Sequence, residues 1–217
     1  MSPNTTDTSD AARFWDRTAR KYAADPIKDM AGYERSVARI RSLLSPTDTV
    51  LEIGCGTGTT ALTLASSARR IVATDVSSEM IAIAREKASA ARCGNVEFAV
   101  ATSDRLPYAD GTFDAVLALN VLHLLPNRGQ LLAEVRRILK RGGVFISKTP
   151  CIGEMNFLIR LAIPVARRLG KAPHVETFSA QMLESGIAKA GFTITETARH
   201  GTTRKDPRIF IVAHTAA

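Results

Sequence analysis

At Val50-Leu51-Glu52-Ile53-Gly54-Cys55-Gly56-Thr57-Gly58, a short apolar run with one acid leads into three glycines at every second position. A strand that turns sharply into a helix needs glycine where the backbone bends or approaches a ligand closely. The spacing differs from the dinucleotide fingerprint G-x-G-x-x-G, because the third glycine comes one residue early. The turn therefore indicates a ligand site, and its spacing argues against an NAD enzyme.

Strand and helix patterns alternate on both sides of this turn. Apolar runs predict strands at 49–53, 70–74, 96–101, 113–119 and 144–148, and helical spacing predicts helices at 57–68, 78–92 and 129–139. Such alternation is typical of parallel βαβ units in a doubly wound sheet with helices on both faces.

Both ends of the chain add elements to this core. Residues 11–44 have the pattern of one or two helices, with Pro26 between two apolar sets. Beyond Pro150, an apolar and basic segment is followed by a helix at 179–190 and strands at 192–197 and 209–214. The connection between these two strands is too short for a crossover helix, so we expect them to be antiparallel. The pattern predicts an α/β fold with a seven-stranded, mostly parallel sheet whose last strand is antiparallel.

One domain accounts for all 217 residues. Within it we expect an N-terminal helical cap at 1–46, a ligand-binding core at 47–150, a lid-like insertion at 151–178, and a helix with an antiparallel strand pair at 179–217.

Composition narrows the function classes. No apolar run has the length of a membrane span, the N-terminus lacks an apolar signal core, and three scattered cysteines favour neither disulfides nor a metal site. These features are typical of a cytoplasmic protein. The net charge of +8 could attract nucleic acid, anionic lipid or an acidic substrate, or it could simply belong to a solvated surface. No aromatic residues interleave with the basic clusters, so no specific nucleic acid is expected.

Four stretches together resemble the class I S-adenosylmethionine-dependent methyltransferases. They are V-L-E-I-G-C-G-T-G, A-T-D-V-S at 73–77, L-P-Y-A-D-G-T-F-D-A-V-L-A-L-N-V-L-H-L-L at 106–125, and R-R-I-L-K-R-G-G-V-F-I-S at 136–147. The resemblance covers residues 50–147 in detail and the order of elements on both sides. It implies a methyltransferase that binds S-adenosyl-L-methionine and releases S-adenosyl-L-homocysteine.

The resemblance assigns the first cofactor-binding residues. Glu52 and Gly54 would hold the aminoacyl part of the cofactor, while Gly56 and Gly58 would let the chain pass close to its ribose and methionine. Asp75 follows the second strand, where a carboxylate can accept hydrogen bonds from both ribose hydroxyls. Its alternative role is to cap the next helix.

Further residues would contact the adenine and the methionyl group. Val76 would pack on the adenine face, and Asn120 would meet the methionyl portion. Thr102 and Ser103 occupy the place where the family often has an aspartate followed by a small residue, and Asp104 lies slightly later. This departure leaves open which of the three contacts the adenine amino group.

Four residues are candidates for the reacting end of the site. Tyr22 either closes over the cofactor, as a tyrosine does in many relatives, or packs in the core. His123 follows Asn120 and is the expected general base, with a packing role as its alternative. His174 lies in the variable insertion and is expected to face the substrate, together with Phe157.

The methyl acceptor is inferred from what surrounds the core. The segment after the fourth strand lacks the N/D-P-P-Y/F motif of enzymes that methylate planar amines, so we expect a small, partly apolar acceptor methylated in line at N, O or S. The insertion 152–178 is apolar and basic, and could cover the substrate pocket or lie on an anionic membrane. The alternatives are therefore a phospholipid-amine methyltransferase at the inner membrane face and an RNA-directed enzyme that uses the basic surface. The sequence leaves the oligomeric state open.

Overall fold

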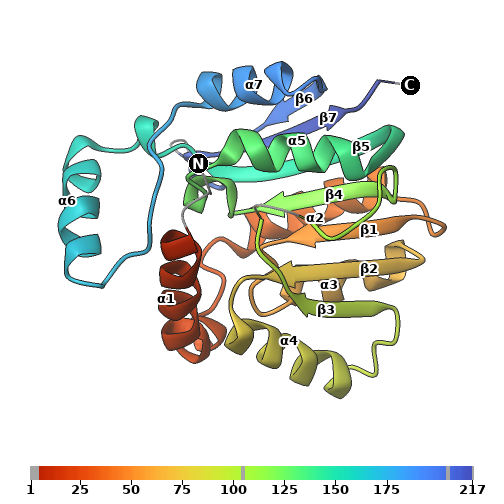
Figure 1. The fold of residues 1–217 in the computed structure, drawn as a ribbon, viewed down its shortest axis with the longest axis horizontal. Coiled ribbons are helices and arrows are strands. Elements are labelled where there is room, and N and C mark those ends of the chain that lie inside the picture. The colour runs from red at the N-terminus through yellow and green to blue at the C-terminus, as the bar shows by residue number, and fades with distance from the viewer. Residues whose placement is uncertain (1–4, 104–105, 204–205, 217) are drawn as a thin grey trace.

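The seven strands form one sheet in the order β3-β2-β1-β4-β5-β7-β6. The computed structural model describes residues 5–103, 106–203 and 206–216. Six strands run parallel, and β7 is antiparallel to its neighbours β5 and β6, which confirms the predicted fold class (Figure 1). The strands are β1 (Thr49–Ile53), β2 (Arg70–Asp75), β3 (Val96–Val100), β4 (Phe113–Leu119), β5 (Leu139–Pro150), β6 (Thr193–Ala198) and β7 (Arg208–His214).

The strand order reverses direction at β1. The chain first adds β2 and β3 on one side of β1, and then crosses to add β4 and β5 on the other. Leu51 lies opposite Val72 on β2 and opposite Val116 on β4, and all five residues of β1 are buried. In open α/β sheets, ligands bind beyond the carboxyl ends of the strands where the order reverses. The fold therefore places a ligand crevice at the glycine turn that follows β1.

Helices cover both faces of the sheet. They are α1 (Thr5–Ala24), α2 (Met30–Leu43), α3 (Thr59–Leu64), α4 (Ser78–Ala90), α5 (Arg128–Ile138), α6 (Phe157–Arg168) and α7 (Ala180–Lys189). Apolar residues of α5 and α7 form one core with the sheet, whereas those of α2, α3 and α4 form the other. This arrangement is a three-layer α/β fold.

Several boundaries differ from the sequence-based predictions. The helix predicted at 57–68 begins only at Thr59 and tightens into a 3₁₀ turn at Ala65–Ser67, because Gly58 has a left-handed backbone with φ of 73°. The N-terminal segment forms two helices, with Pro26 in the connection between them. The strand predicted at 144–148 extends across all of β5, and its pairing with β4 shifts register between Phe113 and Ala115.

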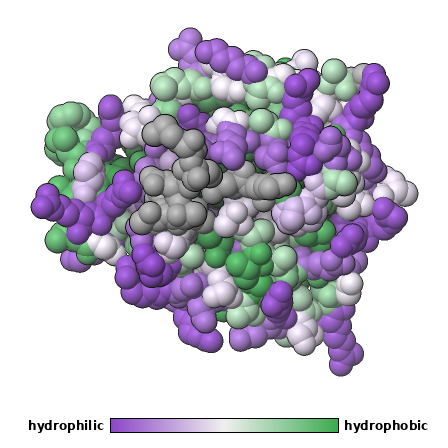
Figure 2. Space-filling view, in the orientation of Figure 1, coloured by the Kyte–Doolittle hydropathy of each residue, from purple (hydrophilic) through white to green (hydrophobic). Residues whose placement is uncertain are grey.

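Helix α6 projects from the body of the molecule beyond the carboxyl ends of the strands (Figure 1). None of its residues is buried, and it forms the apolar patch at the left of Figure 2. Five of its large apolar side chains are between 45% and 71% exposed: Phe157, Leu158, Ile159, Leu161 and Val165. The prediction that this apolar face covers the substrate pocket is therefore wrong for this structure. No described helix combines the length and the hydropathy that a membrane-spanning segment requires.

Candidate active site

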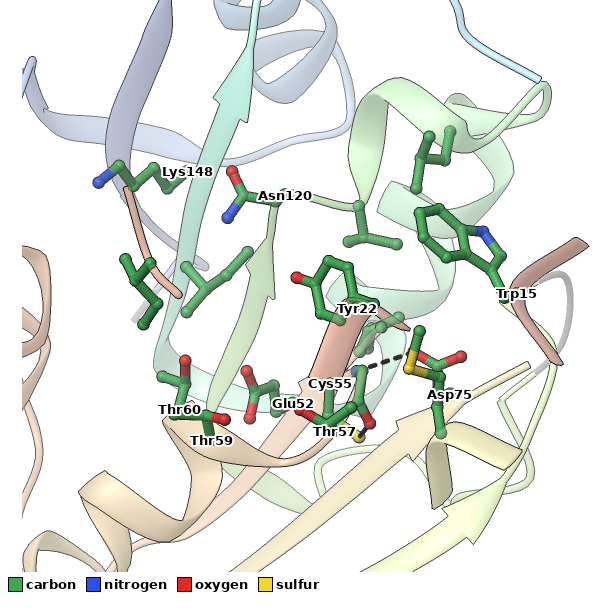
Figure 3. Close-up of a pocket in the computed structure, with 18 of the residues that line it drawn as sticks. Trp15, Tyr22, Glu52, Cys55, Thr57, Thr59, Thr60, Asp75, Asn120 and Lys148 are labelled. Atoms are coloured by element: carbon green, nitrogen blue, oxygen red, sulfur yellow. Dashed lines mark hydrogen bonds between the residues drawn. The ribbon is translucent and has the colours of Figure 1, made fainter. Parts of the chain in front are cut away.

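A cavity of about 490 Å³ opens at the carboxyl ends of β1, β2 and β4 (Figure 3). Its floor is the glycine turn, and its walls come from α1, α2, the ends of β4 and β5, and the segment after α6. The cavity therefore lies in the crevice that the strand order defines, and it joins residues that are far apart in the sequence.

The three glycines of the turn serve different purposes. A Cβ atom on Gly54 would lie 2.6 Å from a methyl group of Val121, and one on Gly58 would lie 2.6 Å from the Phe98 ring. A Cβ atom on Gly56 would meet only the Tyr22 ring, at 3.8 Å, so this glycine keeps the floor of the cavity open. The expectation that Gly58 lies close to the cofactor is wrong, because Gly58 does not line the cavity. Its small size is instead required by packing against Phe98.

Asp75 is held rigidly on the cavity wall. One carboxylate oxygen accepts a hydrogen bond from the Gly56 N–H at 2.9 Å, and the other accepts one from the Ser77 N–H at 3.0 Å. The cap of α4 is the Ser77 side chain, which accepts from the Met80 N–H, so the alternative role of Asp75 as helix cap is wrong. Burial raises the pKa of Asp75, although these backbone hydrogen bonds oppose the rise. The carboxylate is thus fixed beside the glycine turn and can accept hydrogen bonds from hydroxyl groups.

Glu52 is a buried acid that carries an unpartnered oxygen. Its side chain lines the cavity although the residue is only 2% exposed, and its Oε2 atom has no hydrogen-bond partner among the described residues. Burial raises the pKa of Glu52 to about 8, a backbone hydrogen bond from Ala61 opposes this rise, and the charge of Asp75 adds to it. A bound cation would satisfy the free oxygen and stabilise the ionised form.

Two aromatic residues of α1 cover this part of the cavity. The rings of Trp15 and Tyr22 meet edge to face with their centroids 6.1 Å apart, and both line the cavity. Tyr22 is 52% exposed, so it is not an ordinary core tyrosine. Partial burial and the charges of Asp75 and Glu52 raise its pKa. The ring therefore lies over the carboxylates, as Figure 3 shows.

The remaining predicted cofactor residues are divided by the structure. Val76, Ser103 and Asn120 line the cavity, whereas Thr102 does not. Asp104 lies outside the described residues. Asn120 has a left-handed backbone with φ of 56°, and its N–H donates to the Lys148 carbonyl at 2.6 Å. This geometry ends β4 abruptly at the cavity and leaves the Asn120 side chain on its wall.

The structure separates the two candidate histidines. His123 does not line the cavity, its Nδ1 atom is buried without a partner, and burial lowers its pKa to about 4. The expectation that His123 faces the reacting atoms is therefore corrected. His174 does line the cavity, with Nε2 2.7 Å from Glu176 Oε1 and with Nδ1 buried and unpartnered. The expectation that Phe157 faces the substrate is also corrected, because Phe157 lies on exposed α6 and outside the cavity wall.

Sequence reasoning missed the polar end of the cavity. Lys148 and Arg208 line it together with Asp29 and Ser36 of the second helical segment. One signal was present: β-strand alternation places Lys148 on the same side of β5 as Val144 and Ile146, where an apolar residue is expected. The other three residues belong to no local motif.

The fold and the cavity define a doubly wound protein that binds an adenosine-bearing cofactor. Residues 51–147 match the model of the methyltransferase domain family. The demethylmenaquinone methyltransferase of Parafrankia sp. strain EAN1pec is 29% identical over 210 residues, which cover 85% of this chain and 83% of the relative. The ubiquinone/menaquinone biosynthesis C-methyltransferase UbiE of Geotalea daltonii is 30% identical over 132 residues, which cover 59% of this chain but only 50% of that relative.

A solved structure agrees in fold over the whole chain. It is the geranyl diphosphate C-methyltransferase of Streptomyces coelicolor A3(2), determined with Mg²⁺, geranyl diphosphate and S-adenosyl-L-homocysteine. The TM-score is 0.72 at 15% identity, with both chains covered completely. Residues 51–147 thus form a methyltransferase domain of the class I S-adenosylmethionine-dependent type, and the protein is an enzyme that uses S-adenosyl-L-methionine as methyl donor.

The residues of the cavity fit this cofactor. The unpartnered, buried oxygen of Glu52 suits the ammonium of its aminoacyl part. The open space above Gly56 admits the ribose next to Asp75, whose carboxylate suits the two ribose hydroxyls. Val76 and Ser103 line the wall beyond Asp75, where the adenine would lie.

Proposed function

We propose that this enzyme methylates a small, partly apolar molecule. The observation that carries the proposal is that one cavity joins the cofactor-binding floor to a second wall of mixed character. That wall contains apolar side chains of α2 and of the segment after β4, and it ends at a few charged groups. The two curated relatives act, by their names, on demethylmenaquinone and in quinone biosynthesis. The second relative is named a C-methyltransferase, so carbon joins N, O and S as a possible acceptor atom.

The chain would contribute mainly alignment and exclusion of water. When bound, S-adenosyl-L-methionine supplies an activated methyl group on a sulfonium, so positioning of the nucleophile can provide most of the catalysis. Glu52 would fix the aminoacyl part of the cofactor and Asp75 its ribose, while Trp15 and Tyr22 would cover the cofactor from the solvent side.

His174 is the candidate for removing a proton from the acceptor, because this histidine lines the cavity and His123 does not. Glu176, as an ionised acceptor, favours the tautomer with the proton on Nε2 and so leaves a lone pair on the buried Nδ1 atom. As the acceptor atom bonds to the methyl group, its proton would pass to Nδ1, and Glu176 would stabilise the resulting imidazolium. His174 thus takes over the role that the sequence assigned to His123.

A methyl-transfer screen tests this function. The protein is incubated with S-adenosyl-L-methionine labelled in the methyl group and with separate pools of thiols, amines, phenols, quinols, phospholipid extract and RNA. We expect label in an apolar small molecule, and loss of that label with Asp75→Ala. Incorporation confined to RNA would contradict the proposal and favour the RNA-directed alternative.

A second candidate function follows from α6. Its exposed apolar side chains lie next to Arg160, Arg167, Arg168 and Lys171, a combination that binds anionic bilayers. Arg17 on the cavity-lining helix α1 donates to the Gly170 carbonyl at 2.9 Å. This hydrogen bond connects the residues just after α6 to the helix that covers the cofactor site. The acceptor would then be a lipid, such as a phospholipid amine, taken from the membrane surface.

Vesicle sedimentation distinguishes the two candidates. A membrane-surface enzyme should sediment with phosphatidylglycerol vesicles and remain in solution with phosphatidylcholine vesicles. Leu158→Ser combined with Leu161→Ser should abolish sedimentation without lowering the melting temperature, because both side chains are exposed. The matched control is Met182→Ser on α7, another exposed apolar position. Equal sedimentation of the double variant and the wild type would remove this candidate.

A further inference from the structure

Lys148 is a buried cation near the carboxyl end of β5. It is only 5% exposed, although Val144 and Ile146 on the same side of the strand pack in the apolar core. A buried ammonium is costly unless it is paired or hydrogen-bonded. The position of Lys148 on the cavity wall therefore calls for a reason beyond packing.

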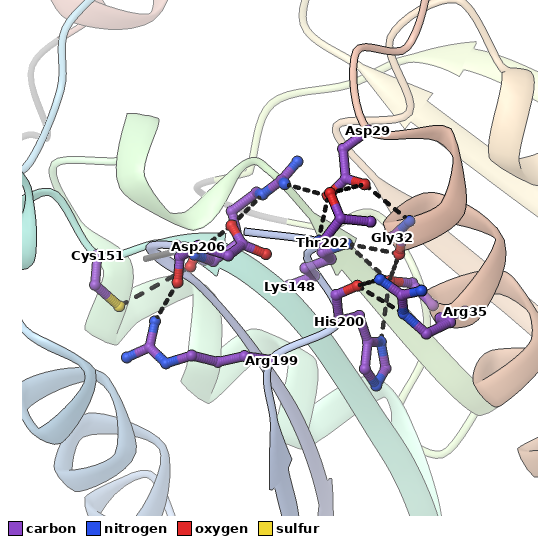
Figure 4. A network of polar contacts seen from close by, with 12 residues as sticks. Asp29, Gly32, Arg35, Lys148, Cys151, Arg199, His200, Thr202 and Asp206 are labelled. Atoms are coloured by element: carbon purple, nitrogen blue, oxygen red, sulfur yellow. Dashed lines mark hydrogen bonds and ion pairs between the residues drawn. The ribbon is translucent and has the colours of Figure 1, made fainter. Parts of the chain in front are cut away.

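The partners of Lys148 are neutral. Its ammonium donates to Ser36 Oγ at 2.7 Å and to the Gly32 carbonyl at 3.2 Å, both on α2 (Figure 4). Among residues 5–103, 106–203 and 206–216, no carboxylate lies within 4.0 Å of it. With three donors and two neutral acceptors, the ammonium retains capacity for one further hydrogen bond.

The neighbouring acids are already paired with another cation. Arg208 lies 3.1 Å from Asp29 Oδ2 and 2.7 Å from Asp206 Oδ1. Arg35 adds a further positive charge, which is directed to the His200 carbonyl. Lys148, Arg208 and Arg35 are thus three cations against the two carboxylates Asp29 and Asp206, and Arg199, which is also drawn in Figure 4, is paired with Glu154. One positive charge remains uncompensated beside the cavity.

This charge lies next to the cofactor floor. Lys148 pairs with Leu119 across β4 and β5, and its carbonyl accepts the Asn120 N–H at 2.6 Å. Figure 3 shows Lys148 and Asn120 side by side above Glu52. Burial and the charge of Arg208 lower the pKa of Lys148, and an anion bound in the cavity would oppose both effects.

We propose that Lys148 binds an anionic oxygen of the methyl acceptor, a carboxylate or an ionised ring hydroxyl on an otherwise apolar body. Ser36 would hold the ammonium in position from α2, because its hydroxyl accepts from Lys148 and already donates to the Gly32 carbonyl. The inference rests on the proposed function and narrows its substrate class to acidic apolar molecules. The competing role for Lys148 is structural, as a link between α2 and β5.

A pair of matched probes separates these roles. Protein loaded with S-adenosyl-L-homocysteine is titrated in a calorimeter with 2-naphthoate and with its neutral analogue 2-naphthamide. The wild type should bind the carboxylate about tenfold more tightly, as one charge-assisted hydrogen bond allows. Lys148→Met should bind both probes equally, whereas Lys148→Arg should keep the preference. Lys28→Met, which removes an exposed charge at the cavity rim, is the control and should keep it as well.

Each outcome decides the proposal. Equal binding of the two probes by the wild type, or no binding of either up to its solubility limit, overturns the subsite without any variant. Equal weakening of both probes in Lys148→Met overturns it in favour of the structural role. If the wild type fails to bind S-adenosyl-L-homocysteine, the proposed function fails instead, so the two failures are distinguishable.

Discussion

At the scale of single residues, the cofactor end of the cavity is controlled by two acids in different environments. Asp75 is fixed by two backbone N–H groups, whereas Glu52 has a free oxygen and an elevated pKa. Two carboxylates in one pocket can therefore serve a neutral and a charged part of the same ligand. Each carboxylate leads to a separate testable prediction.

Replacing Asp75 should weaken cofactor binding severely. Asp75→Ala removes the acceptor for two ribose hydroxyls and also frees the N–H groups of Gly56 and Ser77. We expect affinity for S-adenosyl-L-methionine to fall by about tenfold to a hundredfold, the loss typical of charge-assisted hydrogen bonds. Calorimetry measures it, with Asp110→Ala on the exposed surface as control. Near-normal affinity would overturn the assignment of Asp75.

Cofactor affinity should rise with pH because of Glu52. Its pKa of about 8 means that the carboxyl is mostly protonated below pH 8 when the cavity is empty. The cofactor ammonium stabilises the ionised form, so binding lowers this pKa and releases a proton. We expect affinity to increase from pH 6 to pH 8 and Glu52→Gln to remove the increase. Calorimetry in buffers of different ionisation enthalpy measures the released proton, and proton uptake would contradict the prediction.

At the scale of elements, two glycines of the turn after β1 have different roles: Gly56 leaves space for the cofactor, and Gly58 allows the core to pack. Gly56→Ala introduces a left-handed alanine that faces the open cavity, which should cost about 1 kcal/mol of unfolding free energy and obstruct the cofactor. Gly58→Ala adds a clash with Phe98 and should destabilise more. Denaturant unfolding and calorimetry measure the two effects. A larger stability loss for Gly56→Ala than for Gly58→Ala would contradict this division.

The elements themselves were largely predictable. Strands 49–53 and 113–119 were predicted with the observed bounds. Both are short apolar runs that are buried on both faces of the sheet, a pattern typical of strands in a parallel sheet. The apolar and basic segment that contains helix α6 was recognised in the sequence, but the surroundings of this helix were not predicted. An amphipathic pattern indicates that a helix has an apolar face, and it does not indicate which surface that face meets. Gly58 shows the same limit, since its contact with Phe98 depends on β3 and α4 packing together.

At the scale of the whole molecule, the two walls of the cavity differ in how they are encoded. The cofactor wall lies on one continuous turn and the ends of neighbouring strands, so local motifs were enough to find it. The second wall, where we propose that the acceptor binds, is assembled from α2, the segment after β4, β5, β7 and the segment at 173–174. Arg208 reaches Asp29 close to Lys148 only because the antiparallel strand β7 lies beside β5. The spacing of residues in the sequence does not predict a contact that depends on this strand pairing.

Asp16 connects the cofactor cover to the core. Its carboxylate on α1 accepts hydrogen bonds from Ser77 Oγ at 2.6 Å and from the Glu79 N–H at 3.1 Å, at the start of α4. The same helix α1 carries Trp15 and Tyr22 over the cavity. Because Asp16 itself is absent from the cavity wall, its effect on the cofactor must pass through the position of α1.

Asp16→Ala should therefore loosen the cover without touching the cofactor. We expect faster hydrogen exchange along α1 and a higher dissociation rate for S-adenosyl-L-homocysteine, with an affinity loss of about tenfold if the helix opens readily. Mass-spectrometric hydrogen exchange and stopped-flow displacement measure the two quantities. Asp10→Ala is the matched control, since Asp10 lies on the same helix and, within the described part of the chain, its ion pair is with exposed Arg13. Unchanged exchange in α1 together with unchanged cofactor release would mean that the cover is held by its apolar contacts with α4, through Ala19, Met80 and Ile83, and not by this carboxylate.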